Sequence, residues 1–219
     1  MPYRKTQFVN DEFFHVFNRG TEKRDIFLDN RDRIRFLFLI LYCQSKHNLC
    51  NISRQVSYFV KHQVFNISVK ETEKIILNRF VSIISFCLMP NHFHILLKQD
   101  KENGISEYMQ KVQNAYAKYF NTKYNRTGHL FSGPFKSVHV EDNRQLLHLS
   151  AYIHKNPKEL KQQQNYEKYR WSSLPDYLVK NRWKGLLDPE IILDQFNNKD
   201  GYKEFVKTSM AKEFILDLD

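Results

Sequence analysis

The feature that most constrains the fold is an apolar run that a proline and an asparagine interrupt. Residues Val81–Met89 read VSIISFCLM, which is almost continuously apolar and rich in residues that favour strands. Pro90 and Asn91 break the run, and residues 92–98 (HFHILLK) resume it. Two β-prone segments joined by turn-forming residues predict an antiparallel hairpin.

The elements around this hairpin alternate between strands and helices. Strands are expected at 12–19 and 134–141, and helices at 29–46, 71–80, 105–124 and 142–156. Asp29 or Asn30 would cap the first of these helices, and Asp142 or Asn143 the last. The order of elements predicts an α+β fold, a ferredoxin-like antiparallel sheet with helices packed on it, in the simplest arrangement on one face.

Two further segments complete the predicted organisation. Residues 47–70 have no clean period and resemble an insertion that contains one short helix. Beyond two prolines, a polar C-terminal extension over 181–219 is expected to be helical at 202–214. We therefore predict one domain over residues 1–180, with the insertion at about 47–70, followed by the extension.

Charge and composition narrow the function. Lys and Arg number 34 against 24 Asp and Glu, which gives a net charge of +10, and aromatic residues make up 15%. Basic chains rich in aromatic residues are typical of single-stranded nucleic-acid binders, although a basic protein with an aromatic core has the same composition. Three cysteines without a CxxC pair predict neither a disulfide framework nor a zinc knuckle. The longest strongly apolar run, residues 36–42, is too short to span a bilayer, and the first residues do not resemble a secretory signal, so we expect a cytoplasmic protein.

Two histidines of the predicted hairpin are candidate metal ligands. On a strand, His92 and His94 project from the same face, while Phe93 and Ile95 project into the core. Two imidazoles at this spacing can share one divalent ion. Such a pair also occurs by chance on solvent-exposed strands, so by itself it leaves metal binding open.

A polar stripe on the last predicted helix is the second candidate. His148, Tyr152 and Asn156 are spaced by four residues and therefore share one helical face. The alternative is structural, with Tyr152 packed and Asn156 capping the helix before Pro157. A third candidate, the helix at 105–124 with its lysines and tyrosines, is either a basic stacking surface or an ordinary amphipathic helix. There is no Walker-type loop, no GxGxxG, no GxSxG and no carboxylate cluster at metal-binding spacing.

Five blocks of sequence, in order, resemble one family. The chain resembles the single-tyrosine transposases of the HUH endonuclease superfamily, and within them is most similar to REP-associated tyrosine transposases. The resemblance covers roughly residues 8–178, without the insertion and the extension. The blocks are residues 15–20 (HVFNRG) with Ile26 and Phe27 following, 87–95 (CLMPNHFHI), 128–131 (GHLF), 152–157 (YIHKNP) and 171–173 (WSS).

The resemblance implies roles for particular residues. His92, His94 and Asn156 would bind a divalent metal, Mg²⁺ or Mn²⁺, with His148 as a reserve ligand, and Tyr152 would be the nucleophile. The implied reaction is cleavage and joining of single-stranded DNA, often beside a hairpin, through a covalent phosphotyrosine. Some relatives form dimers that exchange the tyrosine helix and others act as monomers, so a homodimer is left open.

Six basic residues are predicted to bind DNA around this site, because they lie in or beside the family blocks or on the basic helix. They are Arg19, Lys23, Arg24, Lys118, Arg126 and Lys136. Three other functions stay open at this stage: another HUH nickase such as a replication initiator or relaxase, a non-catalytic nucleic-acid-binding protein on the same scaffold, and a metal-dependent hydrolase that uses water. We expect a transposase-type enzyme.

Overall fold

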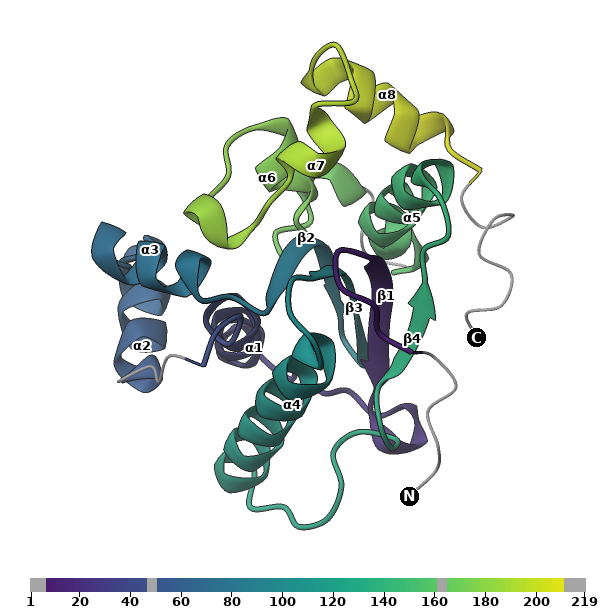
Figure 1. The fold of residues 1–219 in the computed structure, drawn as a ribbon. Helices are drawn as coiled ribbons and strands as arrows, with labels where there is room; N and C mark the ends of the chain where they lie inside the picture. Colours follow the sequence, from purple (N-terminus) through teal and green to yellow (C-terminus); the bar gives the residue numbers. More distant parts are fainter. Residues whose placement is uncertain (1–6, 47–50, 161–164, 211–219) are drawn as a thin grey trace.

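The computed structural model describes residues 7–46, 51–160 and 165–210 (Figure 1). Its strands are β1 (Phe13–Arg19), β2 (Val81–Met89), β3 (His92–Gln99) and β4 (Lys136–His139). Its α-helices are α1 (Asn30–Tyr42), α2 (Ile52–His62), α3 (Val69–Leu77), α4 (Gly104–Lys123), α5 (Asn143–Lys155), α6 (Leu174–Leu178), α7 (Glu190–Leu193) and α8 (Lys199–Thr208). Short 3₁₀ helices are η1 (Thr21–Lys23), η2 (Asn156–Glu159), η3 (Tyr166–Lys168) and η4 (Lys184–Leu186). None of the helices in these ranges is long and apolar enough to cross a membrane.

The strands form an antiparallel sheet in the order β2-β3-β1-β4. The predicted hairpin is β2 and β3, and its turn is at Pro90 and Asn91 as expected. β1 enters between β3 and β4, and its register pairs Phe17 with His94 and Arg19 with His92. This order and direction confirm the predicted ferredoxin-like sheet.

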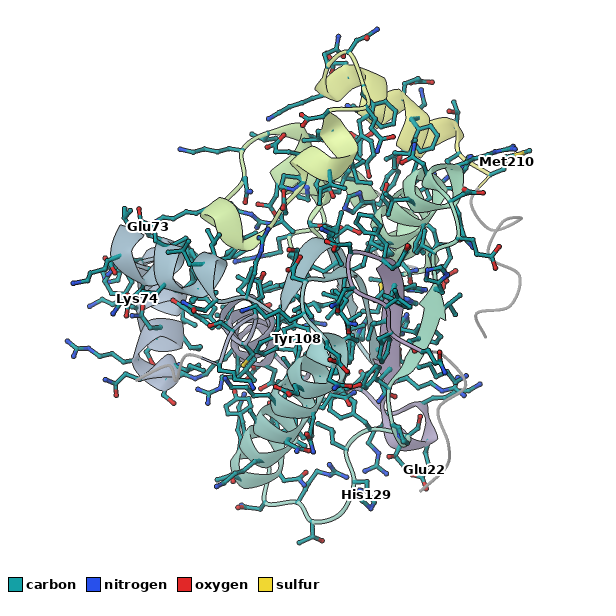
Figure 2. The ribbon with its side chains drawn as sticks, in the orientation of Figure 1. Glu22, Glu73, Lys74, Tyr108, His129 and Met210 are labelled. Carbon is teal, nitrogen blue, oxygen red and sulfur yellow. The ribbon has the colours of Figure 1, made fainter. Side chains whose placement is uncertain are left out.

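Helices cover both faces of the sheet, which corrects the expectation that they lie on one face. On one face, Phe93 of β3 meets Phe36 of α1 with ring centroids 4.9 Å apart. Tyr108 of α4 donates its hydroxyl to the Ile40 carbonyl of α1 at 2.9 Å, inside this layer (Figure 2). Because neighbouring residues of a strand point to opposite faces, His94 faces the other way, toward α5. Figure 1 shows α1 and α4 on one side of the sheet and α5 on the other.

Helix starts follow the predicted caps, whereas helix ends depend on tertiary contacts. The Asp29 side chain accepts from the Asp32 N–H at 2.9 Å and caps α1. α1 ends at Tyr42 rather than near 46, because the Gln44 carbonyl accepts from the Phe80 N–H at 2.8 Å and draws the chain toward β2. In the insertion, α2 is the one short helix expected there, and α3 follows after its Ser68 cap. Glu73 and Lys74 of α3 are labelled at the outer surface of Figure 2.

The C-terminal extension packs on α5 through buried polar contacts. α8 covers Lys199–Thr208, shorter than the predicted 202–214, of which residues 211–214 lie outside the described ranges. Buried Tyr202 of α8 bonds through its hydroxyl to Ser150 at 3.0 Å and to His154 Nδ1 at 2.7 Å. These contacts tie α5 to a segment some 50 residues further along the chain.

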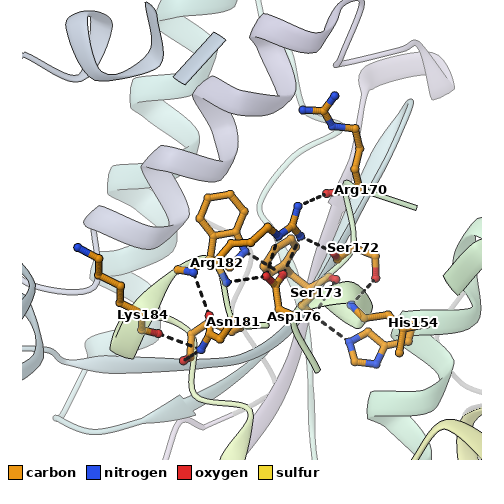
Figure 3. Close-up of polar contacts among 12 residues, drawn as sticks. His154, Arg170, Ser172, Ser173, Asp176, Asn181, Arg182 and Lys184 are labelled. Carbon is orange, nitrogen blue, oxygen red and sulfur yellow. Dashed lines mark hydrogen bonds and ion pairs between the residues drawn. The ribbon is translucent and has the colours of Figure 1, made fainter. Parts of the chain in front are cut away.

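A second, largely buried group, which we call the Asp176 cluster, consists of Asp176, Arg182, Trp183, Ser173 and His154. All but Trp183 are labelled in Figure 3. Arg182 donates to both carboxylate oxygens of Asp176 at 2.7 Å, and the Trp183 indole N–H donates at 2.9 Å. Ser173 lies at the start of α6, where its hydroxyl meets His154 Nε2 at 2.8 Å. The cluster therefore connects the segment after α6 to α5, the helix that contains His154 and Tyr152.

Candidate active site

The two histidines of β3 lie on the α5 face of the sheet. The ring centroids of His92 and His94 are 5.0 Å apart, and the ring planes are perpendicular. His94 is buried, with 6% of its surface exposed, and His92 is half-buried. The pair thus shares one face, as the strand alternation predicted.

α5 brings a tyrosine and an asparagine to these histidines. Asp142 caps the helix by accepting from the Gln145 N–H at 2.6 Å, and Pro157 follows its last turn. The half-buried Tyr152 ring lies edge-on to His94, with centroids 5.7 Å apart. One turn later, Asn156 Oδ1 is 3.4 Å from His92 Nε2. Residues from the hairpin and from α5, about 60 positions apart, therefore meet at one place.

His148 does not join this group, although it lies one turn before Tyr152. Its Nδ1 is 2.8 Å from the Ser209 hydroxyl, and its ring is 5.1 Å from that of Phe205 in α8. The helical spacing alone could not show that α8 covers this part of the helix. The structure therefore gives no support to His148 as a reserve ligand.

Burial keeps His94 and His15 neutral. Desolvation lowers the pKa of His94 well below 6.5, and the neighbouring rings of His15 and His92 lower it further. Desolvation also lowers the pKa of His15, to about 3. A neutral imidazole keeps one ring nitrogen with a lone pair, which is the form that binds metals.

The side chains present fit a divalent cation. His92 Nδ1 is 2.6 Å from Asn91 Oδ1, which accepts its hydrogen, so a neutral His92 ring has its lone pair on Nε2. Nε2 lies 3.4 Å from Asn156 Oδ1, and buried Asn156 Nδ2 has no hydrogen-bond partner in the part of the chain that the structure describes. Two acceptors facing each other repel unless a cation or a hydrogen lies between them. No three His, Cys, Asp or Glu side chains form a metal-binding group in the described ranges, so the candidate set is two imidazoles and an amide.

Three other tyrosines, on α4 and at its C-terminal end, have hydroxyls that are hydrogen-bonded away from the site. Tyr116 is fully buried, donates its hydroxyl to the Ile26 carbonyl at 2.5 Å, and has a pKa raised well above 10 by burial. Tyr119 and Tyr124 donate their hydroxyls to the Asp32 carboxylate at 3.0 and 2.7 Å. Burial and this carboxylate raise the pKa of Tyr119 to about 12. These hydroxyls are therefore poor nucleophiles in the folded protein.

Four of the six predicted DNA-binding residues lie at or near the site's end of the sheet. Exposed Arg19 pairs with His92 across β1 and β3, and paired residues point to the same face. Lys136 pairs with Phe17, and its ammonium is 5.8 Å from the Phe17 ring. The Lys23 carbonyl accepts from Asn91 Nδ2 at 3.1 Å, which places η1 beside the hairpin turn. Arg24 follows η1 and is paired with Glu22 at 2.7 Å.

The other two lie on α4 and directly after it. Lys118 is exposed on α4, which covers the opposite face of the sheet. Arg126 follows α4, donates to Asn121 at 3.2 Å and lies over the Phe120 ring. Whether either residue binds DNA stays a prediction.

Three neighbours of the site received no role from the sequence. His15 Nε2 is 2.9 Å from His94 Nδ1, and the half-buried Phe17 ring stacks on both His15 and His94 at 4.9 and 5.8 Å. Asn91, in the hairpin turn, contacts His92. The alternation of His15, Phe17 and Arg19 on one strand face was the available signal, but only the register of β1 against β3 shows which histidine they meet.

A family model and a solved structure are similar to this chain. A family model described as "Transposase IS200 like" matches residues 44–156, more than half of the chain, and this span includes both histidines, Tyr152 and Asn156. A solved structure of a REP-associated tyrosine transposase bound to a REP hairpin is similar, with a TM-score of 0.53 and 10% sequence identity. That likeness covers 83% of this chain and 88% of the other, and at such identity it concerns the fold. No curated protein matches the chain in sequence.

Proposed function

The chain belongs to the IS200-like transposase family, and on this premise we propose that it is a metal-dependent enzyme that cleaves and rejoins single-stranded DNA through Tyr152. One observation carries the proposal. Tyr152 lies against His94 and one helical turn before Asn156, whose oxygen faces the lone pair of His92. Nucleophile and candidate metal ligands thus occupy one place.

In the proposed reaction the Tyr152 oxygen loses its proton to solvent and attacks a phosphorus of the DNA backbone. A bond forms between the tyrosine oxygen and phosphorus, and the bond from phosphorus to the 3′ oxygen breaks. The departing 3′ oxygen takes up a proton and becomes a hydroxyl. The phosphotyrosine keeps the energy of the ester bond, so a 3′-hydroxyl can later attack it and rejoin the strand without nucleotide hydrolysis.

His92, His94 and Asn156 would hold the divalent ion, through two ring nitrogens and one amide oxygen. When bound, such an ion polarises a phosphoryl oxygen and neutralises the charge that develops on it. A set of imidazole and amide ligands suits Mn²⁺ better than Mg²⁺. Burial contributes by keeping the His94 ring neutral at pH 7.

We propose a single-stranded DNA that carries a hairpin as the substrate. The similar solved structure is of a transposase bound to a REP hairpin, and this chain has a net charge of +10. Arg19 and Lys136 lie on the site's face of the sheet, where they would contact backbone phosphates.

The same chain would supply both nucleophile and metal ligands. α5 is tied to α8 of its own chain by the His154 contact with Tyr202 and by Lys155, whose ammonium donates to the Ser209 carbonyl at 2.7 Å. A mixture of Tyr152→Phe and His94→Ala chains is then expected to remain inactive, whereas exchange of α5 between chains would restore activity.

The direct test uses labelled single-stranded hairpin DNA with flanking sequence, Mn²⁺ and a denaturing gel. The wild-type chain should give a covalent protein–DNA adduct, and Tyr152→Phe should give none while it still binds the DNA. The substitution removes one oxygen, so the fold should lose about 1 kcal/mol or less. Tyr124→Phe is the matched control, because it removes a hydroxyl that is bonded to Asp32 on the opposite face.

Other outcomes point to the other functions. An adduct that persists in Tyr152→Phe would overturn the assignment of the nucleophile. Cleavage by the wild type with repeated turnover and no adduct would indicate a hydrolase that uses water. Binding without cleavage under all conditions would indicate a non-catalytic DNA-binding protein, and nicking confined to replication or transfer origins would indicate another HUH nickase.

A further inference from the structure

Two side chains, His15 and Asn91, contact the rings of the candidate metal ligands His94 and His92. His15 is buried, with 1% of its surface exposed, and its Nε2 is 2.9 Å from His94 Nδ1. Asn91 lies in the hairpin turn, and its Oδ1 is 2.6 Å from His92 Nδ1. Both contacts engage the Nδ1 side of a ring and leave the Nε2 side to the site.

The Asn91 contact has a defined direction. Asn91 Nδ2 donates to the Lys23 carbonyl at 3.1 Å, which fixes the orientation of the amide. Its Oδ1 can only accept, so the hydrogen of neutral His92 must lie on Nδ1. The lone pair is then on Nε2, the atom that faces Asn156 Oδ1 at 3.4 Å.

The His15 contact has two possible directions, and they differ at the site. If His94 donates from Nδ1 to His15 Nε2, then His94 Nε2 has a lone pair and can bind a cation. If His15 donates instead, His94 carries its hydrogen on Nε2 and cannot. Metal-binding histidines commonly donate their other N–H to a fixed acceptor, which sets the tautomer and the ring orientation.

Stability alone does not explain why position 15 is a histidine. Its Nδ1 is buried and has no hydrogen-bond partner among the described residues. An unpaired buried polar atom costs free energy, and an apolar side chain of similar size would avoid that cost. A histidine at this position is therefore better explained by what it does to His94 than by packing.

We propose that His15 and Asn91 are positioning residues, which hold His94 and His92 as Nδ1–H tautomers so that both Nε2 atoms are available to one divalent cation. This inference builds on the proposed function, because the cation is the one assigned there to His92, His94 and Asn156. Neither residue touches the cation or the DNA in this role.

The first test measures Mn²⁺ binding without DNA, by titration calorimetry or by electron paramagnetic resonance of free Mn²⁺. His15→Leu and Asn91→Ala should each weaken Mn²⁺ affinity about 10- to 100-fold. His15→Gln and Asn91→Asp keep an acceptor oxygen and should stay closer to wild type. A merely structural histidine would instead give a less stable His15→Leu variant with unchanged Mn²⁺ affinity.

The matched control is the same substitution at another fully buried histidine. Both ring nitrogens of His154 are hydrogen-bonded, to Tyr202 and Ser173, away from the site. His154→Leu should therefore lower stability and leave Mn²⁺ affinity unchanged.

The second test needs no metal. Long-range proton–nitrogen correlation spectra of the metal-free protein near pH 7.5 report which ring nitrogen carries the hydrogen. His92 and His94 should both be Nδ1–H, and His94 should lose this preference in His15→Leu. An Nε2–H tautomer at His94 in the wild type would overturn the inference.

The failures of the two proposals are distinguishable. If His94→Ala abolishes Mn²⁺ binding while His15→Leu and Asn91→Ala bind as wild type does, positioning is wrong and the metal site stands. If the wild type binds no Mn²⁺, or binds it equally well without His94, the metal assignment fails, and the spectra still decide the tautomers.

Discussion

Two buried polar groups lie along α5, and they differ in how completely they are hydrogen-bonded. In the Asp176 cluster, both carboxylate oxygens receive donors from Arg182, and both ring nitrogens of His154 are bonded. In the candidate site, His15 Nδ1 and Asn156 Nδ2 have no hydrogen-bond partner among the described residues, and the contact between His92 Nε2 and Asn156 Oδ1 is long, at 3.4 Å.

Completeness of hydrogen bonding distinguishes the two groups better than residue type does, because both groups contain histidines. A fully bonded buried network is at its most stable without any ligand. A buried group with unpaired atoms carries a cost that a bound ligand can remove, and in a native protein each such atom calls for an explanation. On the proposed function, the Asp176 cluster contributes stability and the site binds a ligand.

The largest expected effect comes from breaking the Asp176 cluster. Asp176 is fully buried, and Asp176→Ala leaves Arg182 and the Trp183 indole without their acceptor. Removing one partner of a buried ion pair typically costs 3–5 kcal/mol. Because the Arg182 side chain is 34% exposed and can recover water, we expect a loss near the lower end, about 3 kcal/mol. Urea unfolding followed by circular dichroism measures it.

The counterpart in the site is Asn156→Ala. Asn156 is also buried, but among the described residues its Nδ2 has no hydrogen-bond partner, and its Oδ1 has only a long contact. We expect its unfolding free energy to stay within about 1 kcal/mol of wild type in metal-free buffer. Equal losses for the two variants would show that incomplete hydrogen bonding does not distinguish the two groups.

A smaller effect is expected on the free energy of unfolding at acidic pH. Burial lowers the pKa of His154 to about 3, and the residue faces Ser173, Tyr202 and the ring of Tyr177, which are all neutral. In the unfolded chain the pKa returns to about 6.5, so between these values the unfolded state binds the proton and the folded state does not. The stability that neutral His154 contributes is therefore present above pH 6.5 and is lost as the pH falls.

The variant His154→Gln removes this titration and keeps hydrogen-bonding atoms. Between pH 5.5 and 4.5, the unfolding free energy of the wild type should fall more steeply than that of the variant, by about 1 kcal/mol per pH unit. His129→Gln alters an exposed histidine on the loop after α4 and should follow the wild type (Figure 2). Parallel curves for wild type and His154→Gln would mean that His154 is protonated in the folded protein or does not titrate in this range.

The sequence predicted the elements whose signals are local. The β2–β3 hairpin has the predicted strands and turn, because a β-prone run and Pro90 are sufficient for it. The caps Asp29 and Asp142 were each one of the two residues predicted at that helix start, for the same reason. The end of α1 was not, because it depends on a hydrogen bond from Phe80 to Gln44 that no local pattern contains. The second covered face was missed because the order of elements does not show which side of the sheet α5 packs on.

In the site, too, some placements follow from local sequence patterns and others depend on tertiary contacts. The pairing of His92 with His94, and of Tyr152 with Asn156, follows from strand and helix periodicity. The contact between His15 and His94 spans 79 residues and depends on the register of β1. His148 has the spacing of a site residue, yet α8 covers it, and helical periodicity says nothing about a segment 60 residues away.

The smallest expected effect tests which face of the sheet receives DNA. Lys136 lies beside Phe17 on the site's face, whereas Lys118 lies on α4 on the other. If the incompletely bonded group is the one that binds substrate, only the first lysine should contact phosphate. Lys136→Gln should then reduce the slope of log affinity against log salt by roughly 0.7 for single-stranded DNA, as expected for one lost phosphate contact, and Lys118→Gln should leave it unchanged. Fluorescence anisotropy with a labelled hairpin oligonucleotide over a series of salt concentrations measures both slopes. An equal reduction in the two variants would mean that DNA also contacts the α4 face, and a reduction for Lys118 alone would move the DNA path away from the site.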